Sequence, residues 1–132
     1  MKILVACCLL FFAAATRAAE VAKITPAEAD RLVKAGQAVL VDVREPREWA
    51  ETGVAAPAVL LPKSDFDGPQ KKWNGFLAGL GGKQVILYCR SGHRAGLVGA
   101  ALAGQGFKVA NAGGFRDWAD AGLPVRKVET KP

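Results

Sequence analysis

Residues 84–104 read QVILYCRSGHRAGLVGAALAG, and this stretch decides the fold. An apolar run leads to Cys89, a short polar segment follows, and a long series of small apolar residues comes next. That order predicts a buried β-strand, a tight loop and then an α-helix. Because Cys89 would end the strand, its thiol would face the first amides of the helix, where the helix dipole is positive.

Cationic neighbours add to this environment. Arg90 and Arg94 lie in the loop, and His93 lies between them. The helix amides and the cations both favour the thiolate over the thiol, and the thiolate is the nucleophile. The pattern therefore predicts a reactive Cys89 inside an anion-binding loop. The competing interpretation is a buried, inert thiol on a core strand.

The first 18 residues have the pattern of a secretory signal. Lys2 precedes the unbroken apolar and small residues 3–15, and Thr-Arg-Ala at 16–18 offers a small-x-Ala cleavage site. The apolar run is shorter than the ~20 residues that a membrane span needs. We therefore expect cleavage after Ala18, a periplasmic or secreted protein, and no membrane association once the signal is removed. Cys7 ends a stretch like a lipoprotein box, but almost no apolar region precedes it.

Cysteine usage supports a functional thiol. Cys7 and Cys8 fall in the expected signal, so Cys89 alone remains and no internal disulfide can form. An unpaired cysteine in an exported protein is a liability unless it is buried or used. One cysteine and one histidine cannot close a metal site, so we expect no metal.

The charge balance argues against a nucleic-acid partner. The 132-residue chain has a net charge of +6. Loss of Lys2 and Arg17 with the signal lowers the 18 basic residues to 16 against 12 acidic ones, a net charge of +4. The basic residues are scattered, and no dense run occurs. A mild cationic excess is compatible with a small anionic substrate.

Strands and helices alternate along residues 19–126, which we expect to form one domain followed by a polar, frayed tail, 127–132. The expected strands cover 38–43, 59–61, 84–88 and 107–110. The expected helices cover 26–35, 45–50, 69–80, 95–103 and 115–121. Residues 64–68 read as a polar loop and 111–114 as a turn. At the first helix, Thr25 is the expected cap and Glu28 would complete a capping box. Continuously apolar strands predict an α/β fold of three layers, a mainly parallel sheet with helices on both faces.

Three segments together resemble the rhodanese family, in particular single-domain thiosulfate sulfurtransferases. Residues 41–49, VDVREPREW, are similar to its D-V-R-x-x-x-E-[FYW] motif, and residues 88–95, YCRSGHRA, to its C-R-S-G-x-R-[SA] loop. Residues 106–125 contain its C-terminal glycine-rich motif with a tryptophan and its G-[LY]-P ending. The family's G-H-I-x-G-A-x-N-[IL]-P segment is altered at 52–62, where the His and Asn are absent. That difference leaves the conformation of this segment, and a partner contact through it, open.

The resemblance implies a sulfurtransferase that uses a persulfide and needs no cofactor. Cys89 would be catalytic, and the loop would bind the donor through Arg90, Ser91, Gly92, His93 and Arg94. Several of these residues have a second interpretation, because Arg90 and His93 could be surface residues and Ser91 a turn residue. Arg94 could bind substrate oxygens or tie the loop to a carboxylate.

Asp42 and Arg44 are expected to give structural support by orienting loops through hydrogen bonds. The substrates would be a small anionic sulfur donor such as thiosulfate and a thiol or cyanide acceptor. The alternative is a non-enzymatic sulfur carrier or a protein-interaction module. A phosphatase is disfavoured, because Arg94 is the sixth residue counting from Cys89, whereas the phosphatase C-x5-R loop is one residue longer.

Overall fold

The computed structural model describes residues 21–129. The expected signal, residues 1–18, and its cysteines lie outside the described residues. Among the residues described, no helix is both long and apolar enough to cross a membrane.

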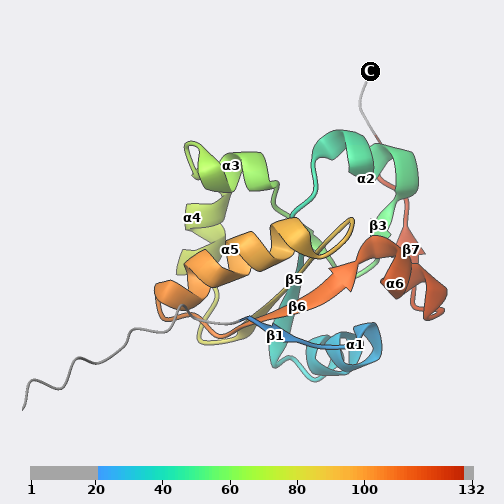
Figure 1. The fold of residues 1–132 in the computed structure, drawn as a ribbon, viewed down its shortest axis with the longest axis horizontal. Coiled ribbons are helices and arrows are strands. Elements are labelled where there is room, and N and C mark those ends of the chain that lie inside the picture. The colour runs from blue at the N-terminus through green and yellow to red at the C-terminus, as the bar shows by residue number, and fades with distance from the viewer. Residues whose placement is uncertain (1–20, 130–132) are drawn as a thin grey trace, which may run out of the picture.

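A five-stranded parallel sheet forms the centre of the domain (Figure 1), with the strand order β1-β6-β5-β2-β4. Its strands are β1 (Ala22–Lys23), β2 (Ala38–Asp42), β4 (Val59–Leu60), β5 (Gln84–Cys89) and β6 (Val109–Gly114). The two central strands, β5 and β2, are buried almost throughout. Their continuous apolar sequences are explained by burial on both faces, as expected for parallel strands. The predicted α/β fold with a mainly parallel sheet is therefore confirmed.

Helices cover both faces of this sheet (Figure 1). On one face lie α3 (Lys63–Asp67), α4 (Lys71–Ala78) and α5 (His93–Gly104), whose core includes Trp73 and Leu102. On the other face lie α1 (Pro26–Lys34) and α6 (Phe115–Asp120), whose core includes Ala29 and Trp118. The remaining helix, α2 (Pro46–Thr52), follows β2.

The strand order changes direction at the neighbouring strands β2 and β5. From β2 the chain proceeds to its neighbour β4, and from β5 it proceeds through α5 to β6 on the opposite side. The connections therefore diverge at the carboxyl ends of β2 and β5, where open α/β sheets bind their ligands. Asp42 ends β2 and Cys89 ends β5, so this divergence brings the two sequence motifs together.

The first helix begins as predicted, but only half of the capping box forms. The Thr25 hydroxyl accepts the Glu28 amide at 3.1 Å, and Pro26 occupies the first turn. The Glu28 carboxylate does not accept a hydrogen bond from the Thr25 amide. It binds Arg31 instead, at 2.6 and 2.9 Å, because a guanidinium one turn along offers a charged partner.

Two segments expected to lack regular structure belong to elements. Residues 64–68 fall largely in α3, which is polar outside but packs Phe66 edge-on against Trp73 at 5.1 Å. Residues 111–114, expected as a turn from their Asn and Gly content, are part of β6. They pair with β5 through a register shift that sets Cys89 opposite Gly114. Gly114 packs closely against the loop that follows β5, because a Cβ there would meet the Arg90 carbonyl.

The altered segment, 52–62, is tied to the chain's C-terminal end. Two short strands, β3 (Val54–Ala55) and β7 (Val125–Arg126), pair antiparallel. The Arg126 guanidinium donates to the carbonyls of Ala56, at 3.1 Å, and Ala58, at 2.9 Å. The Ala55 amide donates to the buried Tyr88 hydroxyl at 2.9 Å. These contacts hold the segment against β5 without the family's His and Asn.

Candidate active site

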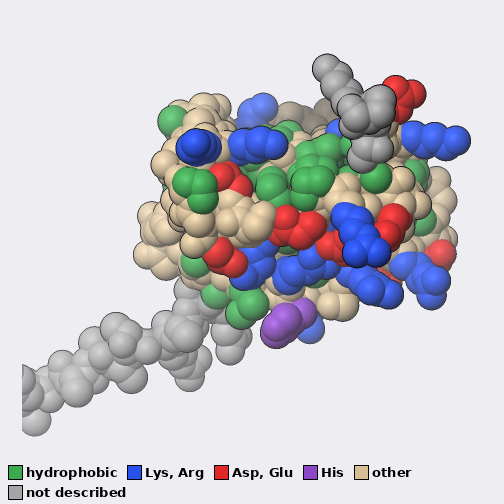
Figure 2. Space-filling view, turned by 90° about the horizontal axis from the view of Figure 1, so that it is seen from above, with side chains coloured by type: hydrophobic (Ala, Val, Ile, Leu, Met, Phe, Trp, Pro, Cys, Tyr) green, Lys and Arg blue, Asp and Glu red, His purple; other side chains and the backbone are tan. Residues whose placement is uncertain are grey.

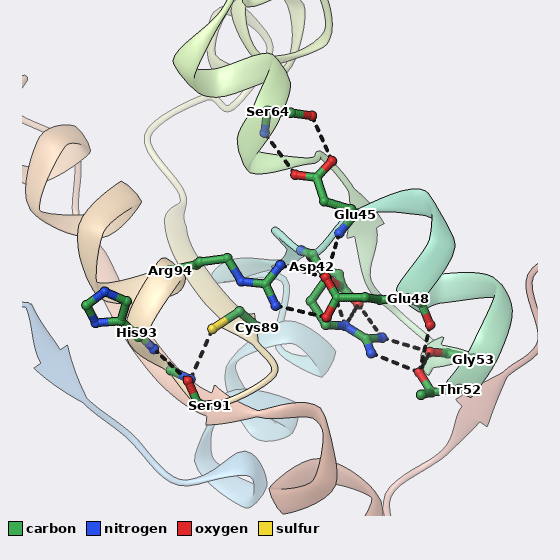
Figure 3. A network of polar contacts seen from close by, with 12 residues as sticks. Asp42, Glu45, Glu48, Thr52, Gly53, Ser64, Cys89, Ser91, His93 and Arg94 are labelled. Atoms are coloured by element: carbon green, nitrogen blue, oxygen red, sulfur yellow. Dashed lines mark hydrogen bonds and ion pairs between the residues drawn. The ribbon is translucent and has the colours of Figure 1, made fainter.

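Cys89 ends β5 as a free, buried cysteine with 1% of its surface exposed. Its Sγ accepts a hydrogen bond from the Gly92 amide at 3.0 Å (Figure 3). The sulfur therefore lies under the loop that leads into α5, and a backbone N–H already points at it. An N–H donor aimed at sulfur stabilises a negative charge there.

Gly92 gives the loop its tight path. Its φ is 94°, in the left-handed region that side chains with a Cβ rarely adopt. A Cβ at this position would also lie 3.3 Å from the Gly113 Cα. The His93 amide contacts the Ser91 hydroxyl at 3.4 Å, and the Gly96 amide donates to the Gly92 carbonyl as the helix begins. Gly92 thus lets the loop turn over the sulfur and start α5 within a few residues.

Strand β6 supports the loop from below. The Asn111 side chain donates to the Gly92 carbonyl at 2.9 Å and accepts the Gly113 amide at 2.9 Å. Gly114 lies directly against the loop, because a Cβ there would be 2.3 Å from the Arg90 carbonyl oxygen. The Gly114 amide donates to Asp117 at 2.8 Å. Sequence reasoning missed Asn111 and Gly114 as site residues, although both lie in the C-terminal motif that carries the family resemblance.

Arg94 is held by a carboxylate from another helix. Its Nη1 and Nη2 donate to Oε1 and Oε2 of Glu48 on α2, at 2.6 and 2.9 Å. The hydrogen bond to Glu48 raises the pKa of Arg94, to which the nearby Cys89 also contributes. The same bond lowers the pKa of Glu48, against its partial burial. Arg94 was expected either to bind substrate oxygens or to tie the loop to a carboxylate. The structure shows the second of these, the bond to Glu48. Glu48 was missed as a site residue, and its signal was the Glu of the D-V-R-x-x-x-E motif.

Asp42 and Arg44 form a buried ion pair beneath the site, with 0% and 2% of their surfaces exposed. Arg44 Nη2 donates to Asp42 Oδ2 at 2.9 Å, and the Arg44 amide donates to Oδ1 at 2.8 Å. The same guanidinium donates to the Thr52 hydroxyl and the Gly53 carbonyl, each at 2.8 Å. These bonds link the end of β2 to the end of α2. Burial, together with the neighbouring Asp42 carboxylate, raises the pKa of the Tyr88 hydroxyl.

The remaining loop residues face solvent. Arg90, Ser91 and His93 are exposed, and the His93 ring points away from the Cys89 sulfur (Figure 3). Two clefts of about 540 Å³ each flank the loop, one beside Arg90 and one beside Ser91 and His93, and Cys89 lines neither. Within residues 21–129, no group of three or more acidic, His and Cys side chains could hold a metal ion.

Comparison with known proteins agrees with this architecture. A family model, the rhodanese-like domain, matches residues 25–121. An uncharacterized protein of Synechocystis sp. is 32% identical over 111 residues, which are 83% of this chain and 58% of that protein. The chain thus spans little more than half the length of that curated relative.

Solved structures give the same result. A Rhodopseudomonas palustris protein of unknown function, named as a possible tyrosine phosphatase, matches with a TM-score of 0.65 and 30% identity, covering 80% of this chain and 85% of that one. The polysulfide-sulfur transferase homodimer of Wolinella succinogenes matches with a TM-score of 0.66 and 26% identity, covering 82% and 80%. A rhodanese-related protein of Thermoplasma volcanium gives 0.65 and 25%, covering 80% and 97%. The three sequence segments, the fold they form and the family match lead to one conclusion: this chain belongs to the rhodanese-like domain family.

Proposed function

We propose that this protein is a sulfurtransferase that carries sulfane sulfur on Cys89. The observation that carries the proposal is the geometry of the loop, in which the Gly92 amide points at a recessed Cys89 sulfur from 3.0 Å. An anionic sulfur species at this position receives a hydrogen bond and the positive end of the α5 dipole. The cationic Arg90 follows Cys89 in the chain and is exposed to solvent.

The chemistry divides into two displacements. The Cys89 thiolate attacks the outer sulfur of thiosulfate, a new S–S bond forms, and the bond to the sulfonate sulfur breaks. Sulfite leaves with the bonding electron pair, and Cys89 becomes a persulfide. A thiolate or cyanide then attacks the outer persulfide sulfur, and Cys89 leaves as thiolate. Each step conserves charge and needs no cofactor, and the two half-reactions predict ping-pong kinetics.

The family supports sulfur transfer, and one relative points to the kind of donor. The Wolinella succinogenes neighbour is named as a polysulfide-sulfur transferase. Polysulfides, like thiosulfate, are small anions with a sulfane sulfur at one end. We therefore place thiosulfate and polysulfide in one class of donors for Cys89.

The loop length separates this proposal from phosphate chemistry, which the name of the Rhodopseudomonas palustris neighbour raises. Counting from Cys89, Arg94 is the sixth residue. Both Nη atoms of its guanidinium donate to Glu48, so they are not available to bind a phosphate group. A loop of this length and a neutralised arginine favour a sulfur-centred reaction.

Intact-mass measurement tests the proposal. After incubation with thiosulfate or polysulfide, the protein should gain one sulfur, about 32 Da, and Cys89→Ser should gain none. Cyanide should then remove the sulfur, with release of thiocyanate. Persulfide formation without turnover would favour the sulfur-carrier alternative. An unchanged mass, or Cys89-dependent hydrolysis of an aryl phosphate faster than sulfur transfer, would refute the proposal.

A further inference from the structure

The charged groups around the Cys89 sulfur include more anions than cations. Arg94 lies beside the sulfur, with Glu48 on its other side and Glu45 close by (Figure 3). All three anionic groups raise the pKa of Arg94: Glu48 most, through its hydrogen bonds, then Cys89 and Glu45 through their charges. They are therefore close enough to act on the charge of this guanidinium and on the charge of any donor that reaches the sulfur.

The positive charge of Arg94 is already neutralised by Glu48. Both Nη atoms donate to the Glu48 carboxylate, at 2.6 and 2.9 Å. The two side chains are only 28% and 23% exposed, so water screens the pair less than it screens a surface pair. An oxyanion that approached Cys89 would have to compete with Glu48 for these donors.

Glu45 adds a carboxylate that is bound by neutral donors alone. Its oxygens accept the Ser64 amide at 3.0 Å and the Ser64 hydroxyl at 2.7 Å. Its own amide donates to Glu48 Oε1 at 3.2 Å, which fixes the two acidic residues next to each other. Within the part of the chain that the structure describes, no cationic side chain forms an ion pair with Glu45. Its negative charge is therefore held in place without a compensating cation.

The other cations near the loop do not balance these charges. Arg44 is bound to Asp42 in a buried pair. Arg90 and His93 are exposed, and the clefts that they line do not include Cys89. On the face seen in Figure 2, basic and acidic side chains are interspersed, so no continuous basic surface leads to the site. The structure therefore offers backbone amides at the sulfur, but no unpaired guanidinium among the described residues.

We propose that Glu45 and Glu48 are specificity-determining residues, which select a sulfur donor with one negative charge over doubly charged thiosulfate. The Cys89 thiolate and the two carboxylates outnumber the single guanidinium of Arg94. Like charges at short range repel, and partial burial strengthens the repulsion. An organic thiosulfonate has an alkyl group in place of one oxyanion of thiosulfate, so it avoids the repulsion of a second charge. The inference rests on the proposed function and names the charge class of the donor for the same sulfur.

The step with a singly charged donor balances in the same way as the step with thiosulfate. The Cys89 thiolate attacks the outer sulfur of the thiosulfonate, a new S–S bond forms, and the bond to the sulfonyl sulfur breaks. The sulfinate leaves with the bonding electron pair, and Cys89 becomes a persulfide. Both donors leave the same product on the protein, so one measurement follows both.

A pair of donors that differ in charge tests the inference. Thiosulfate and methanethiosulfonate are compared by the second-order rate of persulfide formation, followed by intact mass. For each variant, the ratio of the thiosulfate rate to the methanethiosulfonate rate is divided by the same ratio for the wild type. This quotient cancels the intrinsic reactivity of the donors. It also cancels any disturbance of the loop that slows both donors equally, so a merely structural role of either carboxylate would leave it at one.

Glu48→Gln should raise the quotient about fivefold, because it removes one negative charge at short range and leaves the Arg94 charge unpaired. Glu45→Gln should raise it about threefold, and its amide oxygen can still accept a hydrogen bond from Ser64. Arg94→Gln should lower it, because the carboxylates then lack their cation. Glu51→Gln is the matched control, since it removes the same charge from α2 at a pair whose arginine is 89% exposed. Its quotient should stay near one.

Two results would overturn the inference. The first is a quotient near one for both Glu45→Gln and Glu48→Gln. The second is an equal rise in Glu51→Gln, which would show an effect of net charge alone. If Glu48→Gln does not fold, Glu45→Gln decides, because Glu45 contacts only neutral groups of Ser64 through its side chain. In each of these cases, normal persulfide formation on the wild type would leave the proposed function intact. Failure of the wild type to form a persulfide with either donor would instead refute the proposed function and this inference with it.

Discussion

The Glu48 carboxylate binds the Arg94 guanidinium through two parallel hydrogen bonds of 2.6 and 2.9 Å, joining α2 to the first turn of α5. Glu48 Oε1 also accepts the Glu45 amide at 3.2 Å. The pair therefore connects the helix after β2 with the loop after β5. Bidentate pairs of this kind fix orientation as well as charge.

Glu48→Gln should destabilise the protein at neutral pH by about 1 kcal/mol, since the side chains are only partly buried. The hydrogen bond from Arg94 lowers the pKa of Glu48 below its ordinary value of 4.5. The contribution of the pair is therefore present above that value and is lost as the pH falls through the lowered one. Urea unfolding at several pH values should show the gap between wild type and variant closing on acidification. A gap that stays constant with pH would contradict this assignment.

The matched control is Glu51→Gln. Glu51 is also on α2 and pairs with Arg47 at 3.1 Å, but the Arg47 side chain is 89% exposed. Solvent screens such pairs, so we expect no resolvable change in stability or in its pH dependence.

Gly114→Ala should disturb the active loop. The added Cβ would lie 2.3 Å from the Arg90 carbonyl oxygen, so the loop backbone must shift. A displacement of ~1 Å at a reacting group can cost about 10²-fold in rate. We expect sulfur transfer to fall by that order, measured with thiosulfate and cyanide. Gly75→Ala in α4 is the control, because a Cβ there meets nothing within 4 Å and alanine favours the helix by ~0.5–1 kcal/mol. Equal activity in the two variants would rule out close packing as the reason for glycine at 114.

Asn111→Ala should loosen the loop from below. It removes one of the two donors to the Gly92 carbonyl, which keeps the Gly96 amide, and it leaves the Gly113 amide without its acceptor. Unsatisfied groups at a partly buried site cost about 1–3 kcal/mol. Hydrogen exchange of the loop amides should become faster, and the rate of Cys89 alkylation should rise. Asn111→Asp keeps the acceptor for Gly113 and should be intermediate in stability. Unchanged loop exchange in Asn111→Ala would remove Asn111 from the support of the loop.

Arg44→Lys should be strongly destabilising despite the retained charge. A single ammonium cannot reproduce the bonds that the guanidinium makes to Asp42, Thr52 and Gly53. Weakening a buried ion pair on one side costs up to about 3–5 kcal/mol. Chemical unfolding of wild type and variant measures the loss. Arg47→Lys, at an exposed position of α2, should leave the unfolding midpoint unchanged. A comparable midpoint for the two variants would contradict the importance of the buried pair.

We propose that residues 1–18 are removed on export. Their charged start, apolar run and Thr-Arg-Ala site have the order of a secretory signal. N-terminal sequencing of the protein from its native host should read Ala19-Glu20-Val21. A chain that keeps Met1, or one that begins at a lipid-modified Cys7, would contradict export by this route.

The sequence alone determined the α/β class, the parallel sheet and the position of Cys89 at a strand end. These features are local, because short, continuous, β-branched apolar runs bounded by turn residues are typical of buried parallel strands. The left-handed Gly92 could also be expected from its place in a tight loop. The polar residues of α3 and the Asn and Gly residues of 111–114 predicted a loop and a turn, whereas the structure has a helix and a strand there. In both segments the deciding contacts come from elsewhere in the chain: Phe66 packs against Trp73, and residues 111–114 pair with β5.

Only the tertiary structure decided which charges are free. In sequence, Arg90 and Arg94 both lie in the loop after Cys89, and nothing local shows which of them is paired with a carboxylate. In the fold, Arg44 and Arg94 are bound by Asp42 and Glu48, whereas Arg90 and Arg116 face a cleft without an ion-pair partner among residues 21–129. The physical reason is that ion pairing depends on distances of a few ångströms between side chains on different elements. Those distances are set by how α2, α5 and α6 pack at the carboxyl ends of the strands.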